Sequence, residues 1–468
     1  MSKFLQIFRR SASPTHVTEQ HAQDEPLTPS EEKDAHSSPE APSGPTLFIG
    51  HTRFSVHQHG SGYFNATRGA DRGAGLSEQE YTEWLYSDTR LAPRTEIFTT
   101  LSLPQLEIAA RKHDVVHFVS YSPSLPEHHK EKLRAAATKF SFLRLNETTN
   151  PVNSTPSRTL VRQALAERDH GNRPFGVYRL DDDDLLSVRY FDQMATYVTP
   201  RHVGWWVSLG TGFSALRMNG KYVYTRELYY PKSAFGPMAI AAQDSTGEIA
   251  NLAAPKHTVM DKFNPTILDS REPAYFHIRH ESQDSTVKGS VAPFYPEAMN
   301  RILGEGPADL AQVCDLFPVI AGDLSLEPGP AGTGVSLISD PLTLDRDPVT
   351  FEWPHAGPVA LLVQTADEEK LRANQLQVRV AVSPATDSTA EPAAAGIKGF
   401  LSQGKFRYSE QDDSYRSHMP QKSSGFGFVL PIEPPSGVRI TRITLINTKS
   451  EPLNLSTVSA YPLPLRQF

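Results

Sequence analysis

Phe175-Gly176-Val177-Tyr178-Arg179-Leu180 is an apolar run that leads directly into four consecutive aspartates, Asp181 to Asp184, and then into Leu185. A short run of large apolar residues predicts a buried strand of a sheet. In an α/β protein, ligands bind at the carboxyl ends of such strands. The four carboxylates therefore stand where a binding site is expected.

The aspartates repel one another unless a cation lies among them. A divalent ion held by one or two carboxylates and by substrate phosphate oxygens is the usual arrangement for Mg²⁺, and oxygen ligands also suit Mn²⁺. Such an ion would neutralise a leaving nucleoside diphosphate. The alternative is that Asp183 and Asp184 only cap a helix beginning near Leu185, while Asp181 and Asp182 lie in solvent. Four carboxylates directly after a buried strand favour the metal site.

Strand and helix patterns alternate over the region before the aspartates. This alternation predicts an α/β fold, a mostly parallel sheet flanked by helices. The expected strands are Thr46 to Gly50, Val115 to Val119 and Phe142 to Leu145; the expected helices are Leu103 to His113, Pro126 to Lys139, and Ser157 to Arg168 with Ser157 as the N-cap.

Helices and a hairpin are expected after the aspartates. A helix is predicted from Leu185 to Tyr197, and Asn219-Gly220 is a strong signal for a two-residue turn between strands Phe213 to Met218 and Tyr222 to Thr225. This hairpin would form an antiparallel edge of the sheet. Further helices are expected near Pro237 to Ala242 and Tyr295 to Leu303.

The composition changes after about Phe317, where Pro, Gly, Ser and Thr separate short β-like runs such as 359–363, 378–382 and 440–446. Short strands at such spacing predict a smaller β-sandwich domain. At the other end, residues 11–43 hold almost no large apolar side chain, which predicts a disordered tail. The expected organisation is a tail over 1–45, an α/β domain over 46–320 and a sandwich over 340–468.

Composition narrows the choice of partners and compartment. A net charge of -7 and a pI near 6.2 argue against nucleic acid, whose binding needs clustered Lys and Arg. The single Cys314, the lack of long apolar runs and the lack of a secretory pattern predict a cytoplasmic protein. Lys3 to Arg10 could form a short basic and apolar helix at the inner face of the membrane, although the alternative is a frayed terminus.

Several short motifs accompany the acidic run. They are Thr52-Arg53-Phe54 after the first strand, Arg94-x-x-x-Phe98 followed by Leu103-Pro104, then Tyr121-Ser122, Leu125-Pro126 and Tyr178-Arg179-Leu180-Asp181-Asp182-Asp183-Asp184. From about Leu47 to Glu281 the chain resembles the putative rhamnosyltransferase family, which belongs to the GT-A-like nucleotide-sugar glycosyltransferases with an Asp-x-Asp motif. The resemblance implies a GT-A-like fold with the donor site at the acidic run, and leaves the sugar open.

The resemblance also implies roles for the aspartates. Asp-x-Asp residues contact the donor ribose and the metal-bound diphosphate. The resemblance would assign these roles to Asp181 and Asp183 or, in a shifted register, to Asp182 and Asp184. We take Asp181 and Asp182 as donor-binding and Asp183 and Asp184 as ligands of Mn²⁺ or Mg²⁺.

Histidines and arginines supply further candidates. GT-A-like enzymes often complete the metal shell with a downstream histidine, which makes His257 and His280 candidates, the latter in the run His277-Ile278-Arg279-His280. Arg53 follows the first strand and could stack on the base or contact phosphate, or it could form a surface salt bridge. Arg179 could orient an aspartate or only balance its charge.

The expected reaction needs a base and an acceptor. A carboxylate that takes the acceptor proton is expected after the hairpin, where Glu227, Asp244 and Glu248 stay undecided, with Glu227 and Asp244 carried forward. The predicted function is transfer of a sugar, with rhamnose one option, from a nucleotide-diphosphate donor to a carbohydrate such as a cell-surface glycan. The alternatives are a non-catalytic carbohydrate-binding protein with structural Ca²⁺, and a nucleotidyltransferase, which the lack of a Gly-rich triphosphate loop disfavours.

Overall fold

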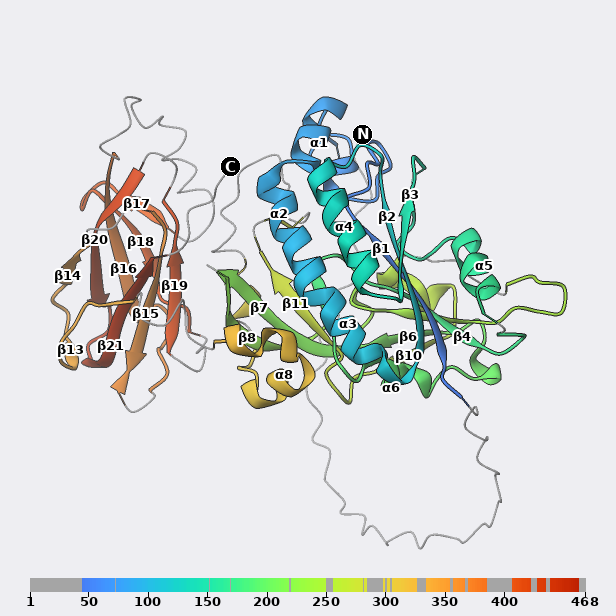
Figure 1. Ribbon diagram of the computed structural model, residues 1–468. Coiled ribbons are helices and arrows are strands. Elements are labelled where there is room, and N and C mark those ends of the chain that lie inside the picture. Colours follow the sequence, from blue (N-terminus) through green and yellow to red (C-terminus); the bar gives the residue numbers. More distant parts are fainter. Residues whose placement is uncertain are drawn as a thin grey trace, which may run out of the picture. The chain divides into compact units, whose positions relative to one another are not determined.

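The computed structural model describes residues 44–462 apart from a set of internal stretches (Figure 1). The stretches outside the description are 72, 151, 169, 219, 250–255, 281, 284–297, 299–300, 304, 326–333, 354–356, 367–368, 385–405, 422–426 and 435–437. Within the described residues, no helix is long and apolar enough to cross a membrane.

A seven-stranded sheet forms the centre of the region before residue 320, with the strand order β10-β6-β9-β4-β1-β2-β3. The strands are β1 (Leu47–Arg53), β2 (Asp114–Tyr121), β3 (Leu143–Glu147), β4 (Phe175–Arg179), β6 (Trp206–Leu209), β9 (Met238–Ala241) and β10 (Thr266–Asp269). Four neighbouring pairs are parallel, and β9 runs antiparallel to both β4 and β6. The sheet is therefore mixed.

Alternate residues of β1 and β4 enter the cores on the two faces of this sheet. Phe48 and Tyr178 belong to one apolar cluster, whereas their neighbours Ile49 and Val177 belong to another. The first face is covered by α3 (Leu103–Ala109) and α6 (Tyr190–Ala195), and it continues under α2 (Asp88–Ile97) and α4 (Glu127–Lys139). The second face is covered by α5 (Arg158–Ala166). A mixed α/β architecture with helices flanking a large sheet is thus confirmed.

Most elements before the aspartates agree with the sequence prediction. The three expected strands correspond to β1, β2 and β3, the three expected helices correspond to α3, α4 and α5, and Ser157 caps α5 by accepting a hydrogen bond from the Leu160 amide. The first strand continues past Gly50 to Arg53. Gly50 is needed for close packing instead, because a Cβ there would lie 2.2 Å from the Tyr178 ring and 2.3 Å from His117 Nδ1.

One predicted helix is wrong, and another begins later than predicted. The run near Pro237 to Ala242 contains β9, whose short apolar sequence is fully buried between two central strands and cannot be told from a helix by pattern alone. Asp184–Leu186 forms β5, which pairs antiparallel with β11 (Tyr275–Arg279), so the expected helix from Leu185 starts only at Tyr190. Asp183 and Asp184 therefore do not cap a helix.

A second, four-stranded sheet has the order β5-β11-β7-β8. The expected hairpin is present as β7 (Thr211–Met218) and β8 (Lys221–Tyr229), although Asn219 of its turn lies outside the described residues. The hairpin belongs to this sheet and not to the edge of the central one. Residues 295–297 of the last predicted helix, Tyr295 to Leu303, also lie outside the description, whereas Arg301 and Ile302 are helical.

Alternation along β11 separates a core face from a polar face. Phe276 and Ile278 pack with Val313 and Leu316 of α8 (Leu310–Leu316). His277 and Arg279, whose side chains alternate with these, line a cavity on the other face.

The C-terminal region consists of two antiparallel five-stranded sheets. One contains β12 (Val335–Ser336), β13 (Leu342–Leu344), β15 (Val359–Thr365), β19 (Phe428–Ile432) and β21 (Leu453–Pro462); the other contains β14 (Val349–Glu352), β16 (Leu376–Pro384), β17 (Arg407–Ser409), β18 (Ser414–His418) and β20 (Val438–Asn447). Leu361 and Val363 of the first sheet share one core with Val378, Val380 and Ile443 of the second. The three β-like runs of the sequence are β15, β16 and β20.

Candidate functional site

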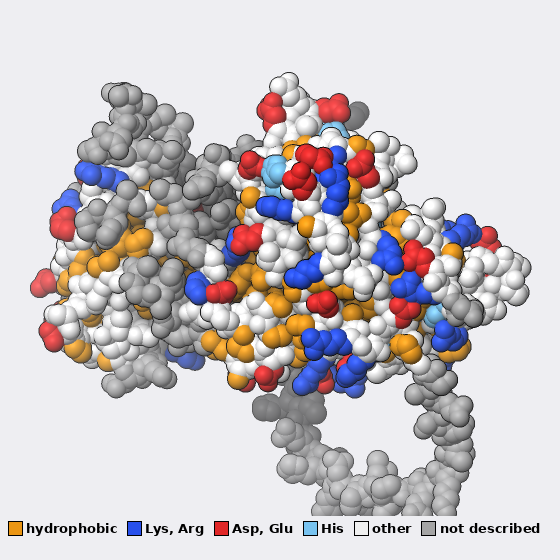
Figure 2. All heavy atoms as spheres, viewed as in Figure 1, with side chains coloured by type: hydrophobic (Ala, Val, Ile, Leu, Met, Phe, Trp, Pro, Cys, Tyr) orange, Lys and Arg blue, Asp and Glu red, His pale blue; other side chains and the backbone are white. Residues whose placement is uncertain are grey.

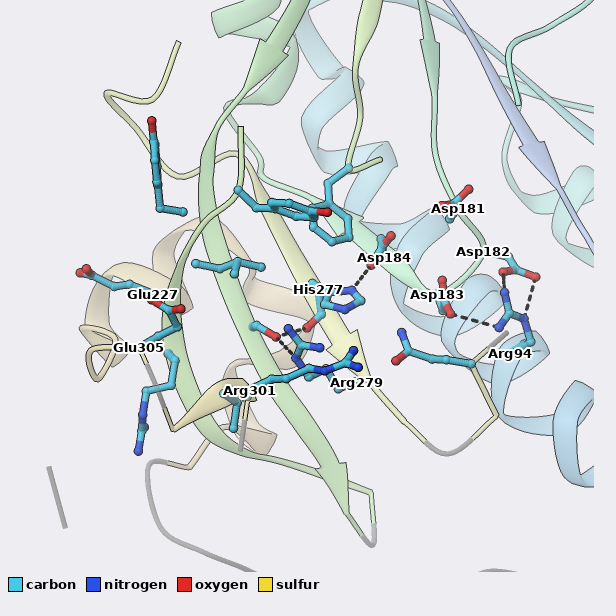
Figure 3. Close-up of a pocket in the computed structure, with 18 of the residues that line it drawn as sticks. Arg94, Asp181, Asp182, Asp183, Asp184, Glu227, His277, Arg279, Arg301 and Glu305 are labelled. Atoms are coloured by element: carbon cyan, nitrogen blue, oxygen red, sulfur yellow. Dashed lines mark hydrogen bonds and ion pairs between the residues drawn. The ribbon is translucent and has the colours of Figure 1, made fainter. Parts of the chain in front are cut away.

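A cavity of about 660 Å³ lies beside the acidic run. Figure 3 shows the aspartates on one side of it and Glu227, Arg301 and Glu305 on the other. The lining residues lie in or after β1, α2, the β4–β5 connection, the β7–β8 hairpin and β11, and three more lie in the segment before α8. They are Arg53, Phe64, Arg94, Asp181, Asp182, Asp183, Asp184, Ser214, Arg226, Glu227, Leu228, Tyr229, Tyr230, Phe235, His277, Arg279, Gln283, Arg301, Ile302 and Glu305. The acidic run thus borders a cleft, as its position after a buried strand predicts.

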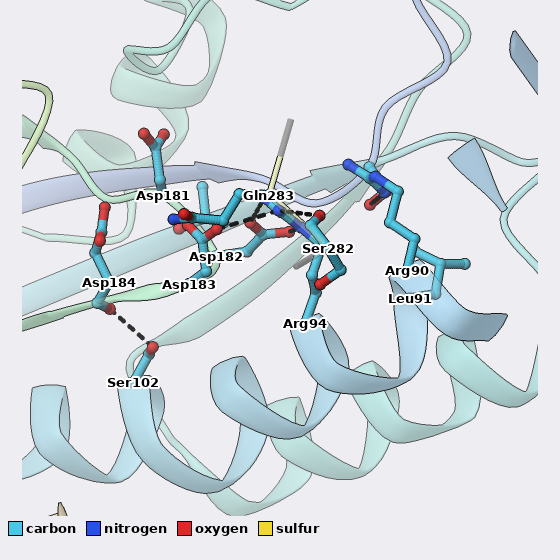
Figure 4. A network of polar contacts seen from close by, with 12 residues as sticks. Arg90, Leu91, Arg94, Ser102, Asp181, Asp182, Asp183, Asp184, Ser282 and Gln283 are labelled. Atoms are coloured by element: carbon cyan, nitrogen blue, oxygen red, sulfur yellow. Dashed lines mark hydrogen bonds and ion pairs between the residues drawn. The ribbon is translucent and has the colours of Figure 1, made fainter. Parts of the chain in front are cut away.

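Arg94 of α2 holds two of the aspartates (Figure 4). Its Nε and Nη2 donate to the two carboxylate oxygens of Asp182, Nε at 3.2 Å, and its Nη1 lies 3.1 Å from Asp183 Oδ2. Nη1 also donates to the Ser282 carbonyl at 3.3 Å. The side chains of Arg94 and Asp182 are only 7 % and 2 % exposed, so this two-pronged ion pair is buried. Part of the charge of the acidic run is therefore balanced by the protein itself.

Asp183 also accepts a hydrogen bond from a histidine. His280 Nε2 lies 3.1 Å from Asp183 Oδ2, and His280 Nδ1 lies 2.7 Å from the Ser282 hydroxyl. Burial acts to raise the pKa of Asp183, but Arg94 and His280 outweigh it and hold that pKa below the ordinary value. Asp183 is therefore an ionised carboxylate facing the cavity.

Asp184 has the opposite electrostatic character. Its Oδ1 lies 2.9 Å from Nδ1 of His277, and its side chain is 3 % exposed. Burial, together with the charges of Asp183 and Asp181, raises the pKa of Asp184 well above the ordinary value. Burial also lowers the pKa of His277 to about 3, so this imidazole is neutral and supplies no positive charge. Ionising Asp184 thus calls for a further cation nearby.

Asp181 is the most exposed of the four aspartates, and one of the two candidate arginines holds it. One nitrogen of Arg179, Nη2, donates to both carboxylate oxygens of Asp181, at 2.6 and 2.7 Å, and the Asp181 side chain is 33 % exposed. Arg53 places its guanidinium 4.7 Å from the centre of the Phe64 ring at the cavity wall. Arg53 therefore lines the cavity, whereas Arg179 is linked to it through its ion pair with Asp181.

The donor set suits a divalent ion that shares its ligands with a substrate. Asp183 and Asp184 are adjacent buried carboxylates, and oxygen is the ligand type that Mg²⁺ and Mn²⁺ prefer. Among the described residues, three metal-binding side chains converge closely at one place only, and that place is Asp88, His128 and His129 rather than this cavity. An ion in the cavity would thus need oxygens from a ligand to fill its shell, as Mg²⁺ usually does.

The two candidate histidines differ in their availability. Both ring nitrogens of His280 are hydrogen-bonded, so it acts here as a partner of Asp183 rather than as a free ligand. His257 Nδ1 lies 2.7 Å from the Lys232 carbonyl, which can only accept, so Nδ1 carries the proton and Nε2 carries the lone pair. The charge of Asp181 acts on His257, but His257 does not line the cavity.

The candidate bases lie in different places. Glu227 is an exposed residue of β8 whose side chain lines the cavity (Figure 3). Asp244 does not line it; its Oδ1 accepts hydrogen bonds from the amides of Thr246 and Glu248 and from the Thr246 hydroxyl, so it closes its own turn. Glu248, the third candidate, pairs with Arg162. The structure brings only Glu227 of these three to the site.

Three residues of the site received no role of their own from the sequence. Arg94 appeared only within a family motif, and its contact with Asp182 spans 88 positions of the chain, which no local pattern reveals. His277 and Arg279 could have been found, because β11 alternates large apolar residues with these polar ones. That alternation predicts a half-buried strand with a polar face.

No curated protein matches the chain. A family model does match it, the one described as Putative rhamnosyl transferase, over residues 48–291. This match covers more than half of the chain and includes all but the first residue of β1, together with α2, the four aspartates and β11. The chain therefore belongs to the Putative rhamnosyl transferase family, a family of glycosyltransferases.

Proposed function

We propose that this protein transfers a sugar from a nucleotide-diphosphate donor, bound with Mg²⁺ or Mn²⁺ in the cavity beside Asp181 to Asp184, to a carbohydrate acceptor. The observation that carries the proposal is the pair Asp183 and Asp184, buried together at the cavity wall. Asp184 favours its protonated form there because burial and the charges of Asp183 and Asp181 outweigh the opposing charges of Arg179 and Arg94. A divalent ion beside Asp184 would offset the free-energy cost of ionising this carboxylate.

Asp183 and Asp184 would hold the ion, and Asp181 and Asp182 would lie toward the nucleotide. Asp182 has both oxygens engaged by Arg94, so its contribution would be to fix the run in place. Asp181 and Arg53 are at the open edge, where a ribose and a base would enter. When bound, the ion would stabilise the negative charge of the leaving diphosphate.

The opposite wall also favours an anionic ligand. Arg279 donates from Nε to the Ser214 hydroxyl at 3.1 Å, and burial and then the charge of Arg301 lower the pKa of Arg279. Both arginines line the cavity (Figure 3). A diphosphate between the metal and these arginines would offset the cost of placing two like charges together.

The fold supports a GT-A-like assignment. The acidic run follows β4, a buried central strand of a mixed sheet flanked by helices, and ligands of such sheets bind at the strand ends. We assign the transferase to residues 46–320 and treat 340–468 as an accessory β-sandwich. Rhamnose is the sugar in the family's name, and we keep it as the first donor to try.

Binding measurements test the proposal directly. Isothermal titration should detect a nucleoside diphosphate only when Mn²⁺ or Mg²⁺ is present, and a panel of nucleotide sugars should show hydrolysis of at least one donor. A carbohydrate-binding protein with structural Ca²⁺ would ignore the nucleotide. That rival also fits the site less well, because Ca²⁺ takes 6–8 oxygen ligands and Arg94 already occupies those of Asp182. Absence of nucleotide binding with either metal would refute the transferase.

Glu227 is the expected base for the acceptor hydroxyl. Replacing Glu227 by glutamine should lower kcat by about 10²- to 10⁴-fold, the usual contribution of a positioned acid or base, while donor binding stays close to normal. Asp244→Asn is the matched control, since that carboxylate does not line the cavity. Steady-state kinetics with the identified donor would measure both variants. Equal kcat values for E227Q and the unaltered protein would exclude Glu227 as the base.

A further inference from the structure

A second cluster of metal-binding side chains lies where α2 meets α4, apart from the cavity. Asp88 is the first residue of α2, and His128 and His129 are in the first turn of α4. The two helices share an apolar core through Leu91 and Leu133, and they run side by side in Figure 1. The cluster therefore joins two elements whose packing is already fixed.

The distances within the cluster fit a single small ion. Asp88 Oδ1 lies 3.2 Å from His128 Nε2 and 3.7 Å from His129 Nε2, and all three ligand atoms lie within 4.8 Å of one another. Ligands of a tetrahedral ion bonded at about 2.0–2.1 Å are roughly 3.3 Å apart. The two distances lie on either side of that value, so small movements of exposed side chains would complete the geometry.

His129 provides independent support for a bound cation. Thr95 donates its hydroxyl proton to the Leu91 carbonyl, so the contact of 2.7 Å between Thr95 Oγ1 and His129 Nδ1 must be donated by the histidine. The neutral ring then carries its lone pair on Nε2. This atom has no hydrogen-bond partner although the side chain is 0 % exposed, and it faces the Asp88 carboxylate. Two electron-rich groups thus face each other with no proton between them.

A proton on His129 Nε2 could link this atom only to Asp88, whose Oδ1 lies 3.7 Å away. A metal ion differs from a proton here because it bonds to three groups at once, including the carboxylate.

We propose that Asp88, His128 and His129 bind a divalent transition-metal ion of the zinc class, with water completing the shell. Two imidazoles and one carboxylate form a ligand set that suits zinc better than Mg²⁺. The ion would tie the first turn of α2 to α4. Helix α2 also carries Arg94, which contacts Asp182 and Asp183. The bound ion would therefore stabilise the position of the helix from which Arg94 reaches these aspartates.

Cobalt provides a direct probe of the site. Titrating the full chain with Co²⁺ should produce the intense visible absorption of a four-coordinate ion at one equivalent, and Zn²⁺ should abolish it by displacement. Asp88→Asn and His128→Gln alter exposed ligands, so both variants should fold. Each substitution removes a ligand. It should therefore weaken Co²⁺ binding by more than the 10- to 100-fold that is typical when a residue hydrogen-bonded to a metal ligand is replaced.

Two control variants separate this site from others. His59→Gln alters an exposed histidine elsewhere, and Asp183→Asn alters the proposed donor site; both should keep the absorption. Zn²⁺ should also raise the melting temperature of the unaltered protein and of H59Q but not of D88N or H128Q. Any of three results would overturn the proposal: no four-coordinate absorption, Co²⁺ binding by D88N and H128Q equal to that of the unaltered protein, or loss of the absorption in D183N alone. These results do not depend on the outcome for nucleotide binding.

Discussion

Replacing Arg94 by alanine should lower the free energy of unfolding by about 3–5 kcal/mol, because it leaves buried carboxylates without their cation. Arg94 engages both oxygens of Asp182 and contacts Asp183, and these side chains are almost fully buried. The free energy of unfolding of Arg94→Lys should lie between those of R94A and the unaltered protein, since lysine keeps the charge but cannot reproduce the planar fork. Denaturant unfolding of the three proteins would measure the differences.

The matched control is an arginine pair at the surface. Arg162 Nη2 lies 3.2 Å from Glu248, with side chains 48 % and 61 % exposed, so Arg162→Ala should cost at most about 1 kcal/mol. If R94A were no less stable than R162A, the carboxylates would have to be protonated or solvated in the native protein. In that case Arg94 would not be the charge that holds the acidic run.

The local signals of the sequence were sufficient for much of the fold. Apolar runs of β-branched and aromatic residues predicted β1, β2 and β4, and Ser157 predicted the start of α5, because burial and capping depend on residues close in sequence. Asn219-Gly220 likewise predicted the β7–β8 hairpin. These features need no knowledge of distant partners.

Elements whose form depends on distant partners were missed or misassigned. Helix α2 contains Pro93, a residue that usually ends helices, and was not predicted. Strand β9 is buried between β4 and β6, and β5 exists because it pairs with β11 some 90 residues later along the chain. Short segments of this kind take their form from tertiary pairing rather than from propensity.

The residues of the candidate site also fall into two groups, those that local sequence patterns could locate and those whose roles depend on distant contacts. The acidic run, Arg53 and Glu227 were placed at two strand ends and one hairpin, and all of them line the cavity, whereas Arg179 pairs with Asp181. Asp244 was placed there too, because nothing local distinguishes a turn-closing aspartate from a base. The roles of Arg94 and His280 depend on contacts across the fold, so the sequence could give His280 only as a metal ligand and Arg94 no role.

Asp183→Asn should remove Mn²⁺-dependent binding of a nucleoside diphosphate and lower kcat/KM by about 10²- to 10³-fold or more. A metal ion that stabilises leaving-group charge contributes several kcal/mol, and each 1.36 kcal/mol is a factor of ten in rate. The amide keeps the size of the side chain and removes the charge that the ion requires. Titration calorimetry with Mn²⁺ present and absent, followed by kinetics with the identified donor, would measure both effects.

Asp182→Asn is the informative comparison, because Asp182 is also buried and shares Arg94 with Asp183. Both variants should lose stability through Arg94, but only D183N should lose a metal ligand. Comparing the two variants at a temperature where both are folded therefore separates the loss of stability from the loss of metal binding. If D182N lost metal-dependent binding while D183N kept it, the ion would sit in the shifted register of the run. Equal, small losses in both would mean that the aspartates only anchor α2, and the metal-dependent mechanism would have to be abandoned.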